Sequence, residues 1–231
     1  MVGEPLADDG AAAGSANGLG PDEAGAATFI PPSDSTARAI LVTAAELFRR
    51  DGYSKATTRQ LGEAVGIRGP SVYYHFKSKE DILLGICTES LSRLSAAVQG
   101  ATPDDFDTLP RLRAMIETHV RTLLDDGDMH TTALTEMRWL SHALLTDVTD
   151  ERDAYEAMFR TAVAAAQASG EVRSDLDARV LTRAILGLMN WTVFWYRPDG
   201  ELAADEIASV LLSLLLEGVV PRTTDQVPAN D

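Results

Sequence analysis

The run TTRQLGEAVGIRGPSVYYHFKSKE, residues 57–80, limits the fold of this chain more than any other stretch. Thr57 can cap a short helix over residues 58–65, and Gly66 then supplies a tight turn. Pro70 fits the first turn of a second helix, where no backbone N–H is needed. Two short helices joined by a glycine turn predict a helix-turn-helix, in which the second helix enters the major groove of DNA.

Charge is distributed unevenly along the chain. The 231 residues carry a formal charge of −15 at pH 7, from 20 Lys or Arg and 35 Asp or Glu. Residues 36–79 nevertheless hold eight Lys or Arg against three acids, whereas residues 82–231 hold twelve Arg against 24 acids. A basic island in an acidic protein indicates that one surface meets phosphates while the remainder repels them.

Helical periodicity dominates the chain and strand signals are almost absent, so we expect an all-α protein. The expected helices lie near residues 36–50, 58–65, 69–75, 78–100, 109–124, 129–145, 149–169, 177–196 and 203–219. The helix near 177–196 is apolar on most of its sides, which indicates burial all round. Because this helix lies near the C-terminus, we infer that a second copy of the chain contributes to its burial.

Composition argues against several classes of protein. Residues 1–34 contain six acids, no Lys or Arg and eighteen Ala, Gly or Pro, so we expect a disordered acidic leader and not a secretory signal. No run of eighteen apolar residues occurs, so we expect no membrane span and a cytoplasmic protein. The single cysteine, Cys87, excludes an internal disulfide framework and is expected to be a small core residue.

The sequence contains no motif typical of a catalytic or metal site. His75, His119, His130 and His142 show no metal-ligand spacing. The chain also lacks a Gly-x-Ser-x-Gly motif, a phosphate-binding glycine loop and a His-Glu-x-x-His motif. We therefore expect no enzyme activity, no cofactor and no metal. A helical enzyme or carrier with an incidental basic patch stays open as an alternative, as does a protein-interaction module.

The second helix of the helix-turn-helix cannot expose all of its side chains. Val72 and Phe76 lie four residues apart and should pack inward. Arg68 could then read guanine edges and Pro70 could touch a thymine methyl, while nearby hydroxyls, His75 and Lys79 donate to phosphates. The expected DNA-contact residues are Thr58, Arg68, Gly69, Pro70, Ser71, Tyr73, Tyr74, His75 and Lys79.

Three motifs follow one another within this N-terminal region: AAELFRRDGY, ATTRQLGEAVGI and SVYYHFKSKEDIL. In order and spacing, residues 36–82 resemble the N-terminal domain of TetR-family transcriptional regulators. The resemblance implies an all-helical homodimer whose first three helices bind operator DNA. It also implies a C-terminal part that binds a small molecule and dimerises through its last two long helices. Gly69-Pro70 stands where many members have Lys-Gly or Lys-Ala, so the operator sequence cannot be transferred.

The chain is expected to have four segments. These are the leader over 1–34, a helix-turn-helix domain over 35–81, a ligand-binding and dimerisation domain over 82–221, and a flexible tail over 222–231. The ending TVFWYRPDGELAADEIASVLLSLLLEGV is similar to family members that regulate fatty-acid, acyl-CoA or sterol breakdown. The chain would then be a repressor that a small apolar or acyl-CoA-like effector releases from DNA.

Aromatic residues and methionines are frequent in the C-terminal part, where they suit either a packed core or a cavity for an apolar ligand. The expected ligand-binding residues are Met115, His119, Trp139, Met158 and Trp191. For His119 a place in the core or at its rim is the alternative. The residues expected at the dimer interface are Leu188, Trp195, Ile207, Leu211, Leu214 and Leu215.

Overall fold

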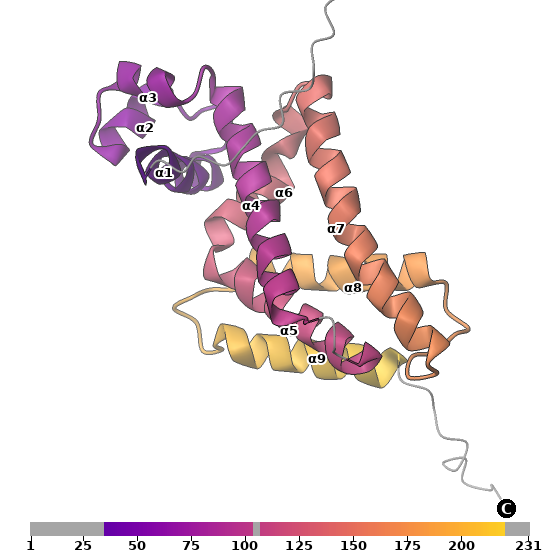
Figure 1. Ribbon diagram of the computed structural model, residues 1–231. Coiled ribbons are helices and arrows are strands. Elements are labelled where there is room, and N and C mark those ends of the chain that lie inside the picture. The colour runs from indigo at the N-terminus through magenta and orange to yellow at the C-terminus, as the bar shows by residue number, and fades with distance from the viewer. Residues whose placement is uncertain (1–34, 104–106, 220–231) are drawn as a thin grey trace, which may run out of the picture.

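The structure is a computed structural model that describes residues 35–103 and 107–219. The expected leader and tail lie outside these ranges. All regular structure within them is helical, which confirms the all-α expectation (Figure 1). The elements are α1 Ser35–Asp51, α2 Thr58–Val65, α3 Gly69–His75, α4 Lys79–Ala101, α5 Thr108–Asp125, α6 Gly127–Glu136, η1 Met137–Trp139, α7 His142–Ala168, α8 Ala178–Asn190, η2 Trp191–Phe194 and α9 Ala204–Val219.

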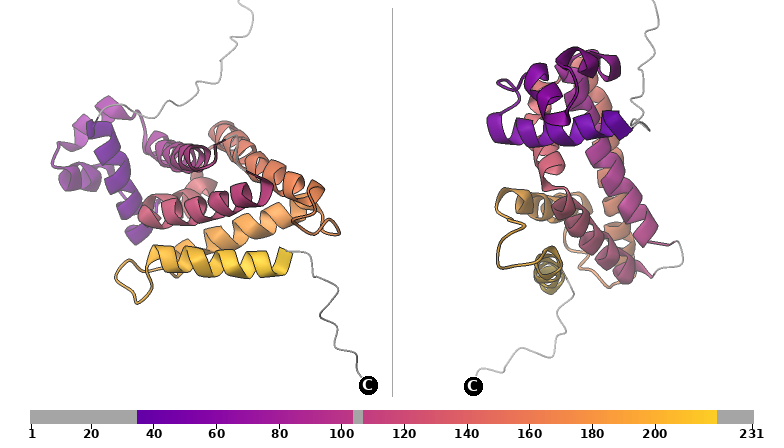
Figure 2. Two further views of the ribbon diagram at one scale, coloured as in Figure 1. Left: turned by 60° about the horizontal axis from the view of Figure 1, so that its bottom comes forward. Right: turned by 90° about the vertical axis from the view of Figure 1, so that its left-hand side faces the viewer.

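Helices α1–α3 form a small head at one end of the molecule, and the remaining helices form a larger body. The long helix α4 leaves the head and enters the body, where α7 runs beside it (Figure 1). Figure 2 places the head and α9 at opposite ends of the molecule. Helices α8 and α9 both pack on α5, so α5 lies at the centre of the body.

Two hydrophobic clusters hold the fold together. The first occupies the head and the start of α4, and it includes Phe48, Val72 and Ile82. It does not end at the head, because Met129 of α6 and Leu140, which precedes α7, are also buried in it. The second cluster fills the body between α4, α5, α7, α8 and α9. Burial of these apolar surfaces is the main favourable contribution to folding.

Local sequence signals fix the ends of the head helices. The Thr57 side chain accepts a hydrogen bond from Gln60 N while Gln60 Oε1 accepts one from Thr57 N, which forms a capping box at the start of α2. Gly66 ends α2 with φ of 80°, a left-handed conformation that glycine adopts without strain. The Ser78 hydroxyl accepts from Asp81 N and begins α4.

The helix expected near residues 129–145 is wrong as a single element. Helix α6 ends at Glu136, the short η1 turn follows, and α7 begins at His142, seven residues earlier than the helix expected from residue 149. Tertiary contacts explain the break, because Leu140 adopts an extended conformation and its side chain is buried in the head cluster. The helix expected near 177–196 likewise ends at Asn190 and continues as the η2 turn.

Candidate DNA-binding surface and effector cavity

The two helices of the helix-turn-helix approach each other closely because of one glycine. A Cβ atom on Gly62 would lie 2.8 Å from Gly69 N and 2.9 Å from Gly69 Cα, both backbone atoms at the start of α3. The backbone N–H of Ile67 donates to Gly62 O across 2.9 Å and closes the turn between the helices. Because Gly62 has no side chain, the start of α3 can pack directly against the backbone of α2.

Helix α3 presents an exposed polar and aromatic face. Val72 and Phe76 are buried at 0% and 4% exposure, as their spacing predicted, whereas Tyr73 and Tyr74 are 52% and 88% exposed. The Tyr73 hydroxyl lies 3.1 Å from Thr58 Oγ1, which joins α3 to the start of α2. The structure brings all the expected DNA-contact residues except Lys79 to α3 and its junction with α2: Thr58, Arg68, Gly69, Pro70, Ser71, Tyr73, Tyr74 and His75.

Lys79 is engaged inside the protein. Its Nζ donates to the carbonyl oxygens of Tyr53, Ala56 and Ser54 at 2.8, 3.1 and 3.4 Å. The same ammonium lies 4.4 Å from the centre of the Tyr53 ring, and partial burial lowers the pKa of Lys79. Lys79 thus ties the loop between α1 and α2 to the first turn of α4.

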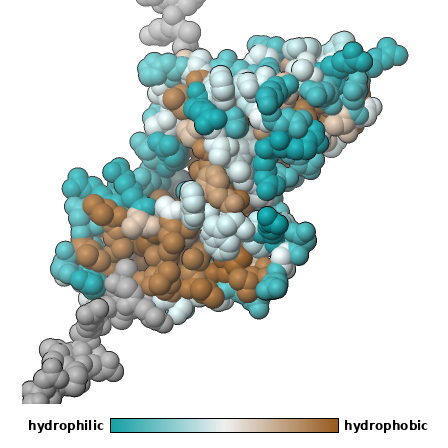
Figure 3. Space-filling view, turned by 180° about the vertical axis from the view of Figure 1, so that it is seen from behind, coloured by the Kyte–Doolittle hydropathy of each residue, from teal (hydrophilic) through white to brown (hydrophobic). Residues whose placement is uncertain are grey.

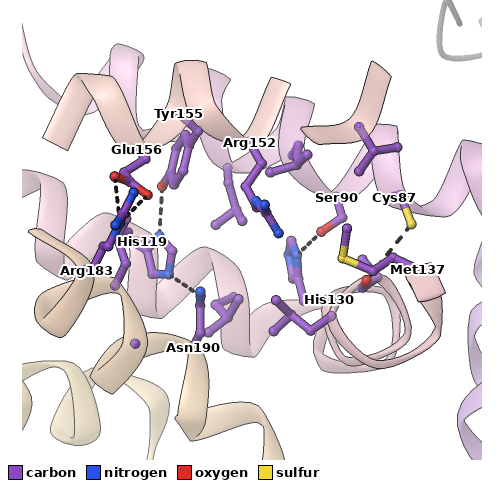
Figure 4. Close-up of a pocket in the computed structure, with 18 residues that line it drawn as sticks. Cys87, Ser90, His119, His130, Met137, Arg152, Tyr155, Glu156, Arg183 and Asn190 are labelled. Atoms are coloured by element: carbon purple, nitrogen blue, oxygen red, sulfur yellow. Dashed lines mark hydrogen bonds and ion pairs between the residues drawn. The ribbon is translucent and has the colours of Figure 1, made fainter. Parts of the chain in front are cut away.

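A cavity of about 240 Å³ lies in the body, walled by helices α4 to α8 (Figure 4). Its position is informative, because its lining comes from both hydrophobic clusters. Cys87 and Val148 belong to the cluster of the head, whereas Leu94 and Tyr155 belong to that of the body. A molecule in this cavity would therefore contact both clusters at once.

One wall of the cavity carries a relay of neutral polar groups. His119 Nε2 donates to Asn190 Oδ1 at 3.1 Å, so His119 Nδ1 is the acceptor from the Tyr155 hydroxyl at 2.7 Å. Burial lowers the pKa of His119 to about 4 and raises that of Tyr155, so both side chains are neutral at physiological pH. The relay offers hydrogen bonds to a ligand without adding charge to the cavity.

A second polar pair lies elsewhere along the wall. Ser90 Oγ and His130 Nδ1 are 2.7 Å apart, and burial lowers the pKa of His130 to about 4. Cys87 also lines the cavity, and burial raises the pKa of its thiol to about 12. Cys87 is therefore a neutral lining residue and not a reactive thiolate, in keeping with its expected packing role.

Among the five residues expected to bind a ligand, the structure brings only His119 to this cavity. Met115 is buried in the body core, and Met158 lines a separate groove between α4 and α7. Trp139 and Trp191 are 48% and 61% exposed and do not line the cavity. The aromatic and methionine content of the chain therefore did not single out the residues that wall it.

The sequence did not single out several polar residues of the cavity: Ser90, His130, Arg152, Tyr155, Glu156 and Asn190. A signal exists on α7, where Val148, Arg152 and Tyr155 follow one another at spacings of four and three residues and share one face. The same spacing is typical of any buried helix face, so only the contacts with four other helices identify the cavity.

The residues expected at a dimer interface divide into two groups. Ile207 and Leu211 are buried within this chain at 3% and 8% exposure, because their face of α9 packs on α5. Trp195 and Leu214 are exposed, and Leu188 and Leu215 are partly buried. The body also carries an exposed apolar face over α8, η2 and α9 (Figure 3). Its large members are Val180, Trp191, Phe194, Trp195, Val210 and Leu214.

The described ranges offer neither a metal centre nor a membrane-spanning helix. No group of three or more His, Cys, Asp or Glu side chains there is arranged to hold a metal ion. None of the helices described is long and apolar enough to cross a membrane.

A helix-turn-helix head on a helical body with an internal cavity defines a DNA-binding regulator that responds to a ligand. Residues 40–86 match the family described as bacterial regulatory proteins, tetR family, and residues 106–219 match the tetracyclin repressor-like C-terminal domain. The chain belongs to the TetR family of transcriptional regulators, as its motifs indicated. This family consists of regulators and not enzymes, and dimerisation and ligand binding are typical of it.

Three relatives illustrate the match. The HTH-type transcriptional repressor KstR2 of Rhodococcus jostii is 27% identical over 198 residues, which cover 82% of this chain and 96% of that protein. The regulator PfmR of Thermus thermophilus is 32% identical with a TM-score of 0.72, covering 77% and 97% of the two chains. AibR, solved with isovaleryl coenzyme A and operator DNA, is 26% identical with a TM-score of 0.71, covering 78% and 98%.

Proposed function

We propose that this protein is a homodimeric repressor that binds operator DNA through α3 and releases it when a small apolar or acyl-CoA-like effector occupies the cavity. The observation that carries this proposal is the position of the cavity between the core of the head and the core of the body. The complex of AibR with isovaleryl coenzyme A and operator DNA supports the same pair of ligands. Because its partner is operator DNA, we place its action in the cytoplasm.

The head supplies the DNA contacts in this proposal. Tyr74, Ser71 and Arg68 are exposed on or just before α3, where a recognition helix meets base edges and phosphates. Tyr73 is partly exposed and already bonded to Thr58, so these two hydroxyls act as a pair. Lys79 contributes indirectly, by holding the loop that precedes α2.

The exposed apolar face of α8, η2 and α9 is the proposed dimer interface. Val180, Trp191, Val210 and Leu214 are all more than half exposed in the single chain, although each is large and apolar. Contiguous apolar surface of this kind typically marks a protein–protein contact. Operator binding by such a dimer requires that the two recognition helices lie about 34–36 Å apart, which is the spacing of successive major grooves on one side of DNA.

The junction between α6 and α7 is the proposed route from the cavity to the head. Met137 lines the cavity, and the neighbouring Trp139 ring lies 6.0 Å from the ring of Tyr53 in the head. Two residues further on, the backbone N–H of Ser141 donates to Glu80 Oε1 across 2.6 Å. An effector that displaces Met137 would therefore shift the contacts of Trp139 with Tyr53 and of Ser141 with Glu80. The effector changes operator binding only as far as its affinity differs between the DNA-binding and the released conformation.

The test is operator binding by the purified full chain. Fluorescence anisotropy with DNA from upstream of its own gene should show salt-dependent, sequence-selective binding that exceeds binding to scrambled DNA. The variant Tyr74→Ala should bind about tenfold or more weakly with an unchanged melting temperature, whereas Tyr74→Phe should keep most of the affinity. Equal affinity for upstream and scrambled DNA at all salt concentrations would rule the proposed function out.

A further inference from the structure

The charges that line the cavity do not cancel. Arg183 Nε lies 3.2 Å from Glu156 Oε1, so these two opposite charges form an ion pair. The two cavity histidines are neutral at physiological pH because the pKa of each lies near 4. Arg152 also lines the cavity, and it makes no hydrogen bond or ion pair with any residue of the described ranges. The wall therefore carries one uncompensated positive charge.

Figure 4 shows how Arg152 is placed. Its side chain extends from α7 into the cavity toward His130, between Tyr155 and Ser90. Val148 and Tyr155 lie on the same face of α7, one turn before and one turn after it, and they keep this face turned inward. Arg152 itself is solvent-exposed, so its guanidinium lies where the cavity opens to water.

The surroundings make this charge attractive to an anion. Apolar side chains form most of the wall, and low-dielectric walls strengthen the field of a charge at the mouth of a cavity. Residues 82–231 carry a net charge of −12, with twelve Arg among 24 acids, so acidic partners for Arg152 are abundant in this part of the chain. An arginine that faces a cavity without such a partner is suited to an acidic group on a ligand.

The size and the remaining polar groups restrict the rest of the ligand. A volume of about 240 Å³ lies below the range of roughly 300–1,000 Å³ that is usual for sites of drug-sized ligands, so only a compact apolar group fits inside. The Asn190 side-chain oxygen is used by His119, which leaves the Asn190 amide N–H groups available to a ligand oxygen.

We propose that the effector is an amphiphile with a compact apolar body and one anionic group, and that Arg152 is the residue that selects for this anionic group. The inference rests on the proposed role of the cavity as the effector site. The anionic group is either the carboxylate of a free acid or a phosphate of a coenzyme A thioester that remains at the mouth. Both present oxygen anions that a guanidinium binds through paired hydrogen bonds.

Isothermal titration calorimetry of the full chain tests this proposal with a defined panel. The probes are straight-chain carboxylates of four to twelve carbons, their coenzyme A thioesters and the matching neutral alcohols. We expect the anionic probes to bind more tightly than the alcohols, and Arg152→Gln to weaken anion binding by about tenfold or more. Arg152→Lys keeps the charge and should lose less. Binding of free acids assigns the carboxylate, and binding of thioesters alone assigns the phosphate.

Arg160→Gln is the matched control, because Arg160 lies on the same helix, pairs with Glu156 across 3.7 Å and does not line the cavity. It removes the same charge and should leave probe affinity unchanged. The proposal fails if Arg152→Gln binds the anions as tightly as the wild type, if the alcohols bind equally well, or if no probe in the panel binds. Operator binding measured on the wild-type protein without any probe is a separate readout, and its absence counts against the repressor function instead.

Discussion

Lys79 Nζ lies 4.4 Å from the centre of the Tyr53 ring and donates a 2.8 Å hydrogen bond to the carbonyl oxygen of the same residue. One ammonium thus holds both the side chain and the backbone of Tyr53. Because Tyr53 packs edge-on against Phe48 at the end of α1, this contact connects the start of α4 to the core of the head. The loop that leads into α2 is therefore fixed from α4.

We predict that Lys79→Ala lowers both the stability of the protein and its affinity for operator DNA. The substitution leaves the carbonyl oxygens of Tyr53 and Ala56 without their charged donor, at a cost of about 1–3 kcal/mol. Lys77→Ala is the control, because Lys77 is exposed and its loss removes the same charge from the head. Thermal unfolding separates the two, and equal melting temperatures for both variants would contradict the role given to Lys79.

We predict that Gly62→Ala disturbs the head although alanine favours helices. The added Cβ would lie 2.8 Å from Gly69 N, so α3 must move, and overpacking of this kind costs about 1–3 kcal/mol. Gly69→Ala is the matched control for stability, since the nearest atom to its Cβ is Arg59 Cα at an ordinary 3.5 Å. The melting temperature should fall in the first variant, together with operator affinity, and hold in the second. The reverse order of melting temperatures would show that this helix contact does not limit the fold.

We predict that charges on the outer face of α9 dissociate the dimer without unfolding the chain. Val210→Glu combined with Leu214→Glu adds two acids to the outer face of α9, where Val210 is 65% and Leu214 is 58% exposed in the single chain. Leu211→Glu instead places a carboxylate in the body core, which destabilises the fold by several kcal/mol. Light scattering and circular dichroism should report a folded monomer for the first variant and loss of helix for the second. A dimer that survives the double change would place the interface elsewhere.

We predict that the protein loses stability as the pH falls from about 6.5 to about 4. The pKa of His119 and of His130 lies near 4 in the folded chain, so in this window the unfolded chain binds protons that the folded chain does not. Stability therefore rises with pH there, by up to about 1.4 kcal/mol per pH unit for each histidine. Urea unfolding at a fixed protein concentration measures this slope.

The variants His119→Gln and His142→Gln assign the slope. His119 is buried in the body core, whereas His142 is exposed at the start of α7. His119→Gln should reduce the slope of the free energy of unfolding against pH by the contribution of one histidine. His142→Gln should leave this slope unchanged. If both variants keep the slope of the wild type, His119 does not contribute to it.

The head could be predicted from sequence almost in full because its signals are local. The cap at Thr57, the left-handed turn at Gly66 and the inward pair Val72 and Phe76 each act within a few residues. The cavity could not be predicted in this way, since His119 meets Tyr155 and Asn190 from positions 36 and 71 residues away. The break before α7 was missed for the same reason, because burial of Leu140 against the head causes it.

The shared core of the head has a consequence for recombination among relatives. Met129 and Leu140 fill this core from positions well beyond the three head helices, at 0% and 6% exposure. A chimera joined at residue 82 would take its DNA-binding helices from one parent. The residues that complete the core of those helices, Met129 and Leu140, would come from the other parent. A chimera that keeps the packing of the head must therefore take the segment from Met129 to Val148 from the same parent as the head. The unit that can be exchanged between relatives is thus discontinuous in sequence.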